Sequence, residues 1–132
     1  MGLRAPTNPR VTVLMAVYNG SAFLRQAIES ILKQTFTDYE FLIINDASTD
    51  DSGAIIASYR DPRIRVVNNR TNLGLTKSLN IGLKLAKAAL IARMDADDVS
   101  HPQRLAKQIA LMETDRNYGL IAGRMEVIDT EG

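Results

Sequence analysis

The acidic segment Asp95-Ala96-Asp97-Asp98 is the part of this 132-residue chain whose side chains are best suited to chemistry. It follows an apolar run, residues 88–92, after two intervening residues. Three neighbouring carboxylates repel one another unless a positive group lies among them. Magnesium and manganese prefer oxygen ligands, so a site for a divalent cation is one interpretation. The other is a solvated acidic turn that caps a helix, and the tetrapeptide alone slightly favours this second interpretation.

Apolar segments with strand character alternate with helix-like segments along the chain. We expect strands over residues 11–17, 41–44, 64–67 and 90–92, and a fifth over 119–123, with another beginning near Met125. Between them, apolar residues recur at three- and four-residue spacing, as in Leu24, Ala27, Ile28, Ile31 and Leu32, or Leu75, Leu79, Leu83 and Ala86. This alternation predicts a mainly parallel sheet with helices on both faces, a three-layer α/β/α fold.

Several polar residues stand where helices are expected to begin. Asn19-Gly20-Ser21 and Ser48-Thr49-Asp50-Asp51 can cap the first two helices, and Asn72-Leu73-Gly74 opens the third. Ser100 with Gln103 three residues later has the spacing of a capping box, and Pro102 falls in the first turn of the same predicted helix. The sequence thus predicts caps that are local to each helix.

Polar residues also follow three of the expected strands. Tyr18 and Asn19 leave the first, Asp46 leaves the second, and the acidic segment leaves the fourth. In doubly covered parallel sheets, ligands bind at the carboxyl ends of the strands. We therefore expect these residues along one edge of the sheet, which favours a binding site over a set of unrelated turns.

Composition bounds the remaining classes. Hydrophobic residues make up 45% and charged residues 23%, as in an ordinary globular domain, and the net charge of +1 gives no reason to expect nucleic acid as a partner. The chain has no cysteine, which excludes disulfides and thiolate metal sites and agrees with a cytoplasmic location. Residues 1–10 lack an apolar signal-peptide region, and we interpret them as a flexible lead-in to a domain over 11–132.

Taken in order, several blocks of the sequence resemble glycosyltransferase family 2, whose members have the GT-A fold and mostly transfer sugars with inversion. The blocks are Ala16-Val17-Tyr18-Asn19, Ser30-Ile31-Leu32-Lys33-Gln34-Thr35, Ile43-Ile44-Asn45-Asp46-Ala47-Ser48-Thr49-Asp50, Asn72-Leu73-Gly74, Asn80-Ile81-Gly82, Met94-Asp95-Ala96-Asp97-Asp98 and Pro102-Gln103-Arg104-Leu105. The match spans about residues 11 to 123. A lone Asp-x-Asp is nonspecific, whereas these blocks in this order are strongly specific.

The resemblance implies a nucleotide-diphosphate-sugar site. By position, Tyr18 and Asp46 correspond to residues that hold the base, which suits the imide N–H of uracil and favours a UDP-sugar. Asp95 corresponds to a ribose contact and Asp97 to the ligand of a divalent cation, manganese or magnesium, which would neutralise the departing diphosphate. From the residues alone, a half-buried Tyr18 and a turn-forming Asp46 remain open.

Other polar residues near the expected site have less defined roles. Asp98 is either a supporting acid or a helix-start residue, and Asn19 is a candidate supporting residue. Lys77 and Arg93 could reach phosphate or the acids, but solvated charges are the more common outcome. We expect Arg104 to pair with the nearby acids and fix their geometry. His101, the single histidine, could act as a base or belong to the capping segment.

The family's catalytic base lies well beyond the Asp-x-Asp segment, in the half that binds the acceptor. The resemblance therefore covers the donor-nucleotide part of a GT-A domain, truncated after the Asp-x-Asp region, and we expect these residues alone to bind a nucleotide sugar and transfer little. The implied acceptor is a glycan or a lipid-linked glycan in polysaccharide synthesis, with membrane association of a full-length protein. An open sheet edge would also favour self-association.

Other functions fit less well or remain open. A phosphoacceptor signalling domain needs paired carboxylates after the first strand, and Val17-Tyr18-Asn19-Gly20 has none. A dinucleotide-binding domain needs G-x-G-x-x-G there, which residues 19–24 do not supply. A non-catalytic module that binds nucleotide sugars, and a metal-dependent nucleotidyltransferase, both remain open.

Overall fold

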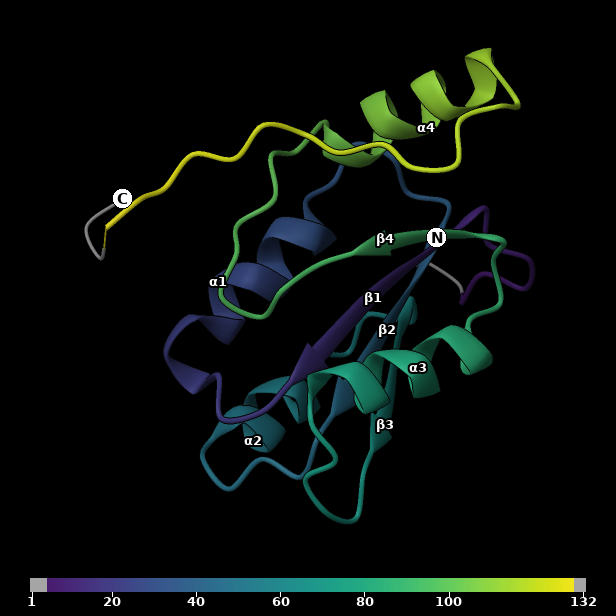
Figure 1. Ribbon diagram of the computed structural model, residues 1–132. Coiled ribbons are helices and arrows are strands. Elements are labelled where there is room, and N and C mark those ends of the chain that lie inside the picture. The colour runs from purple at the N-terminus through teal and green to yellow at the C-terminus, as the bar shows by residue number, and fades with distance from the viewer. Residues whose placement is uncertain (1–4, 130–132) are drawn as a thin grey trace.

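A computed structural model describes residues 5–129 of the chain. Its elements follow the order β1 (Val11–Val17), α1 (Ser21–Leu32), β2 (Tyr39–Asn45), α2 (Ser52–Ala57), β3 (Ile64–Asn68), α3 (Leu75–Leu85), β4 (Leu90–Arg93) and α4 (Arg104–Thr114) (Figure 1). The strict alternation of strand and helix confirms the expected α/β class.

The four strands form one parallel sheet with the order β3-β2-β1-β4. Val11 of β1 pairs with Tyr39 of β2, and Val17 pairs with Asn45, so the two central strands are in register over their full length. β4 pairs with the first half of β1, where Leu14 lies opposite Arg93. Because all four strands run the same way, the residues that follow β1, β2 and β4 emerge at one edge of the sheet, as predicted.

The expected fifth strand over residues 119–123, and the further one near Met125, are wrong. Residues 115–129 contain no helix or strand. This segment leaves α4 and runs back along it, where Gly123 approaches the side chain of Gln108 (Figure 1). Leu120 is 85% exposed and Val127 95% exposed. An apolar run becomes a strand when it pairs with a sheet edge, and this run lies beside a helix instead.

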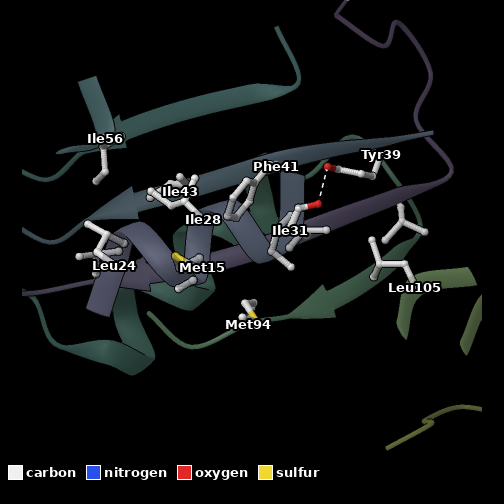
Figure 2. Close-up of a cluster of buried hydrophobic side chains, with 14 of the residues drawn as sticks. Met15, Leu24, Ile28, Ile31, Tyr39, Phe41, Ile43, Ile56, Met94 and Leu105 are labelled. Carbon is white, nitrogen blue, oxygen red and sulfur yellow. Dashed lines mark hydrogen bonds between the residues drawn. The ribbon is translucent and has the colours of Figure 1, made fainter. Parts of the chain in front are cut away.

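The main core lies between one face of the sheet and the helices α1, α2 and α4. Met15, Phe41 and Ile43 point from the strands toward α1, as Figure 2 shows. The hydroxyl of Tyr39 donates a hydrogen bond of 2.8 Å to the carbonyl of Ile31, which satisfies its polar end inside this core. Leu105 and Ile109 are the buried residues that α4 contributes.

A second, smaller core lies on the opposite face of the sheet, under α3. Its fully buried members are Leu14, Leu42 and Ile44. Gly82 packs directly on Leu14: a Cβ atom at this position would lie 2.2 Å from Leu14 Cδ1. The Asn-Ile-Gly sequence at residues 80–82 therefore has a packing role, since it lets α3 approach the sheet closely.

Two further observations concern the ends of the chain. Residues 1–4 of the predicted lead-in lie outside the described residues, but Pro9 is buried and the guanidinium of Arg10 lies 5.6 Å from the centre of the Phe36 ring. Within residues 5–129, no helix combines the length and hydrophobicity needed to cross a membrane.

Candidate functional site

A pocket of about 340 Å3 opens where β1 and β2 end, and two of the predicted site residues line it. Tyr18, directly after β1, is 52% exposed, so much of its side chain is available to a ligand. Asp46, directly after β2, is only 2% exposed. The Asp46 amide donates to the Val17 carbonyl at 2.8 Å, which joins the two strand ends. The remaining lining residues are Ala16, Val17, Asn72, Gly74 and Leu75.

The Asp46 carboxylate holds the opposite wall of this pocket. Its Oδ1 accepts hydrogen bonds from Asn69 Nδ2 at 2.7 Å and from the Leu73 amide at 2.9 Å, and its Oδ2 accepts from the Gly74 amide at 2.8 Å. Burial alone would raise the pKa of Asp46, but these donors outweigh it and hold the pKa below its ordinary value. Asp46 is therefore a buried carboxylate that stays ionised and fixes the entrance to α3.

The segments that follow β1 and β2 are clasped together by side chains. Asn19 Oδ1 accepts from the amides of Thr49 at 2.8 Å and Asp50 at 3.3 Å, while the Asn19 amide donates to Ser48 Oγ. Asn19 has φ 51, a left-handed conformation that asparagine tolerates better than most residues. These contacts of Asn19 fix the backbone next to Tyr18, and its supporting role at a binding site stays a prediction.

Asp50 is a structural contributor that the sequence patterns did not single out as a site residue. Its Oδ2 accepts from the Ser21 amide at 3.0 Å and its Oδ1 from the Ser52 amide at 2.9 Å. These are the first residues of α1 and α2, so one carboxylate caps both helices. Hydrogen bonds, the largest contribution being that of Ser52, keep the pKa of Asp50 well below its ordinary value. Its position directly after Ser48-Thr49 was the available signal.

The acidic segment lies beside the loops that follow β1 and β2. A Cβ atom on Gly20 would lie 3.6 Å from the Cβ of Ala96, which places the loop of Asp95 to Asp98 next to the end of β1. Arg93 Nη2 donates to Asp95 Oδ1 at 2.8 Å. Burial, followed by the charges of Asp95 and Asp97, raises the pKa of Asp98. Arg93 pairs with Asp95, but the carboxylates of the loop still repel one another, and a cation would be attracted to them.

The carboxylates of the acidic loop fit a divalent cation that is coordinated mainly by the phosphates of a bound substrate and by water. Among residues 5–129, no three histidine, cysteine, aspartate or glutamate side chains converge as a ready-made metal cage. Magnesium-type sites commonly use one or two carboxylates together with substrate phosphates and water. Asp97 and Asp98, both exposed in the loop that follows β4, could supply oxygen ligands to such a site.

The expectation for Arg104 needs correction, whereas Lys77 has the solvated charge that we named as the more common outcome. Arg104 forms no ion pair with the three acids; it donates instead to the Arg93 carbonyl at 2.8 Å and to Gln108 Oε1 at 3.1 Å, and it senses Asp98 only through its charge. Lys77 is exposed on α3 and, within the described part of the chain, makes no ion pair. Arg104 thus supports the backbone that leads into the acidic loop.

The predicted capping box of Ser100 and Gln103 is also wrong. α4 begins at Arg104, and Gln103 makes no side-chain capping bond. The Leu105 amide donates instead to Gln34 Oε1 at 3.0 Å, and the Ser100 amide donates to Ser30 Oγ at 2.9 Å. Residues of α1 and of the turn after it therefore perform the function that we assigned to the local sequence. His101 contributes its carbonyl, which accepts from Gln34 Nε2 at 2.8 Å.

Solved structures with a similar fold include proteins in complex with nucleotide sugars. A structure of Staphylococcus aureus TarS 1–349 in complex with UDP-GlcNAc matches with a TM-score of 0.75 and 27% identity, over 80% of this chain and 31% of that one. The mannosyltransferase PcManGT from Pyrobaculum calidifontis, in complex with GDP-Man and Mn2+, matches in fold with a TM-score of 0.72 and 24% identity, over 84% of this chain and 34% of that one. These similarities confirm the expected GT-A fold.

Sequence comparison leads to the same group. The putative glycosyltransferase EpsE of Bacillus subtilis (strain 168) is 40% identical over 96% of this chain and 46% of its own length. The Escherichia coli UDP-Glc:alpha-D-GlcNAc-diphosphoundecaprenol beta-1,3-glucosyltransferase WfaP is 36% identical over 82% of this chain and 43% of its own length. The chain thus spans less than half of these relatives. The family Glycosyl transferase family 2 matches residues 12–132, and the chain belongs to that family.

Proposed function

We propose that this chain binds the nucleotide-diphosphate-sugar donor of a glycosyltransferase, with UDP as the nucleotide and a divalent cation at the diphosphate. The observation that carries the proposal is the pocket between Tyr18 and Asp46, which opens at the same sheet edge as the acidic loop. The exposed aromatic ring and the buried carboxylate would contact the base, and the acidic loop would contact the ribose and the metal-bound phosphates.

Base recognition follows from the chemistry of Tyr18 and Asp46. A tyrosine ring can stack on a base, and an ionised carboxylate accepts a hydrogen bond but donates none, which favours bases with an N–H at the contacting edge. The hydroxyl of Ser78 also stabilises Asp46. Among the pyrimidines, uracil has an imide N–H that could donate a hydrogen bond to Asp46. Cytosine has no such N–H and is expected to bind less well.

The acidic loop would hold the rest of the donor. Arg93 engages Oδ1 of Asp95, so its Oδ2 is available to a ribose hydroxyl. Asp97, with Asp98 beside it, would hold the cation. A bound divalent cation would neutralise charge on the leaving diphosphate. For the whole protein we propose transfer of the sugar to a glycan or lipid-linked glycan, consistent with the acceptor named for the E. coli relative.

Calorimetric titration of the chain with UDP, CDP and GDP tests this function. With manganese present we expect UDP to bind more tightly than CDP, and removal of manganese to weaken UDP binding. Asp97→Asn should abolish the manganese dependence without unfolding the chain, because its side chain is exposed. Asp38→Asn, an exposed change at the opposite end of β2, is the control. Equal binding of all three nucleotides, or none of any, would count against the proposal.

A further inference from the structure

The block Ser30–Thr35 carries a buried glutamine whose side chain reaches across the molecule. Gln34, just after α1, is 3% exposed. Its Nε2 donates to the Ser30 carbonyl at 3.1 Å and to the His101 carbonyl at 2.8 Å, and its Oε1 accepts from the Leu105 amide at 3.0 Å. A buried side-chain amide whose hydrogen-bonding groups are all paired is held rigidly and fixes the positions of its partners. Gln34 therefore ties α1 to the start of α4.

Two more hydrogen bonds extend this connection along the same segment. Ser30 Oγ accepts from the Ser100 amide at 2.9 Å and donates to the Ala27 carbonyl at 2.8 Å. The Thr35 amide donates to the Pro102 carbonyl at 2.9 Å. Ser30 and Ser100 are both buried, 8% and 5% exposed. We call the three residues Ser30, Gln34 and Thr35 the α1 clasp.

The acidic loop is attached at one end to β4 and at the other end to the α1 clasp. On the β4 side, the Met94 amide donates to the Leu14 carbonyl at 3.0 Å, which anchors the loop to β1. On the other side the anchor is Ser100, held by Ser30. Between these anchors, one backbone hydrogen bond, from the Asp98 amide to the Asp95 carbonyl at 3.3 Å, shapes the loop. The positions of Asp97 and Asp98 therefore depend on both anchors.

We infer that Ser30 and Gln34 are positioning residues for the metal-binding acids, an inference that rests on the function proposed above. A cation accepts oxygen ligands only within a narrow range of distance, so loosening one anchor lowers its affinity although no ligand is removed. The base pocket has a separate support, because Asn19, Asp46 and Asp50 hold Tyr18 and its surroundings. Loss of the clasp should thus weaken the metal-dependent part of nucleotide binding and spare the rest.

Ser30→Ala and Gln34→Met test this separation. Ser30→Ala removes one hydroxyl from a helix, where alanine is well tolerated, and Gln34→Met keeps the approximate size of the side chain while removing its hydrogen bonds. Gln26→Met, on the exposed face of the same helix, is the matched control. The Kd for UDP is measured by calorimetry with manganese and by NMR titration with EDTA. Circular dichroism establishes that each variant is folded.

With manganese, we expect the Kd of the two clasp variants to rise by about tenfold or more, the usual effect of losing a residue that orients a metal ligand. With EDTA their Kd should equal that of the unmodified chain, and Gln26→Met should match it in both conditions. Amide hydrogen exchange of Asp98 should also become faster in Ser30→Ala, a readout that needs no ligand.

The possible failures are distinguishable. Clasp variants that keep both the manganese dependence and the Asp98 exchange rate of the unmodified chain would overturn this inference alone. An equal loss of affinity with and without manganese would also overturn it, because it would indicate a general structural role. An unmodified chain that binds UDP equally with and without manganese would overturn the proposed function, and the positioning role with it. If Gln34→Met does not fold, Ser30→Ala decides.

Discussion

Replacing Asp46 by asparagine exchanges one carboxylate oxygen for an NH2 group and should strongly destabilise the chain. The new amide group must face at least one hydrogen-bond donor, and the least damaging orientation places it against the Gly74 amide and keeps the bonds to Asn69 and Leu73. An unpaired buried donor costs about 1–3 kcal/mol. The two remaining bonds also lose the extra strength of a charged acceptor, about 0.5–1 kcal/mol together. We therefore expect a loss of about 1.5–4 kcal/mol at pH 7, a large part of a typical domain's stability.

Urea unfolding of the two proteins between pH 2.5 and 7 measures this difference and its origin. The fold holds the pKa of Asp46 below its unfolded value, so the stabilisation is complete above that unfolded value, near 4, and is lost as the pH falls through the folded pKa. The asparagine of the variant cannot titrate in this range. The gap in unfolding free energy should therefore narrow below about pH 4, while other acids, common to both proteins, cancel.

Asp38→Asn is the control, because Asp38 is exposed at the other end of the same strand and should change stability by less than about 0.5 kcal/mol. If Asp46→Asn were as stable as the unmodified chain at pH 7, the carboxylate would not hold the segment of Leu73 and Gly74. If the gap were large but independent of pH, the effect would come from shape or packing, and the reasoning from charge would be refuted.

Gly82→Ala should lower the free energy of unfolding by about 1–3 kcal/mol, because the new Cβ atom clashes with Leu14. Gly53→Ala in α2, where the nearest contact of a Cβ atom is 3.6 Å, should be neutral or stabilising. Urea midpoints compare the two variants, and a Gly82→Ala variant as stable as the unmodified chain would contradict the close approach of α3. Ala47→Gly should stabilise by about 1 kcal/mol, because Ala47 has φ 59; no gain in melting temperature would argue against strain there. Asp50→Asn should lower the thermal midpoint at pH 7, because the fold holds the pKa of Asp50 below its unfolded value. The difference in midpoint between the two proteins should vanish in strong acid, where Asp50 of the unmodified chain is protonated. A difference that persists in acid would exclude the lost charge as the cause of the destabilisation.

Strand positions were predictable where burial is reflected in continuous apolar sequence. β1 has the predicted bounds, residues 11–17. β2 begins two residues earlier than predicted, because Tyr39 and Glu40 are polar-tipped yet fully buried. Glu40 Oε1 accepts from Thr12 Oγ1 at 2.7 Å, a contact between residues 28 positions apart. Hydrophobic periodicity cannot recognise a buried polar residue whose partner lies on another strand.

The position of the candidate binding residues could be predicted from sequence, because strand ends in a parallel sheet meet at one edge. Tyr18 and Asp46 indeed line one pocket, and the acidic loop lies beside them. Their partners could not be located in the same way. The donors to Asp46 include the backbone amides of Leu73 and Gly74, 27 and 28 residues away, and a backbone amide leaves no trace in the sequence.

The first residues of the helices show why the sequence did not reveal these hydrogen-bond partners. The sequence patterns predicted caps from residues next to each helix. In the structure, the amide at the start of α1 donates to Asp50, the amide of Gly74 before α3 donates to Asp46, and an amide in the first turn of α4 donates to Gln34. Each of these side chains lies outside the helix whose start it holds: Asp46 and Asp50 are in the loop between β2 and α2, and Gln34 is in the turn after α1. A helix that begins on a distant side chain forms only when the two elements are already packed, so capping and site assembly become one cooperative event. Nucleotide binding should therefore protect the first turns of α1 and α3 from hydrogen exchange more than their last turns. Uniform protection along these helices would contradict that coupling.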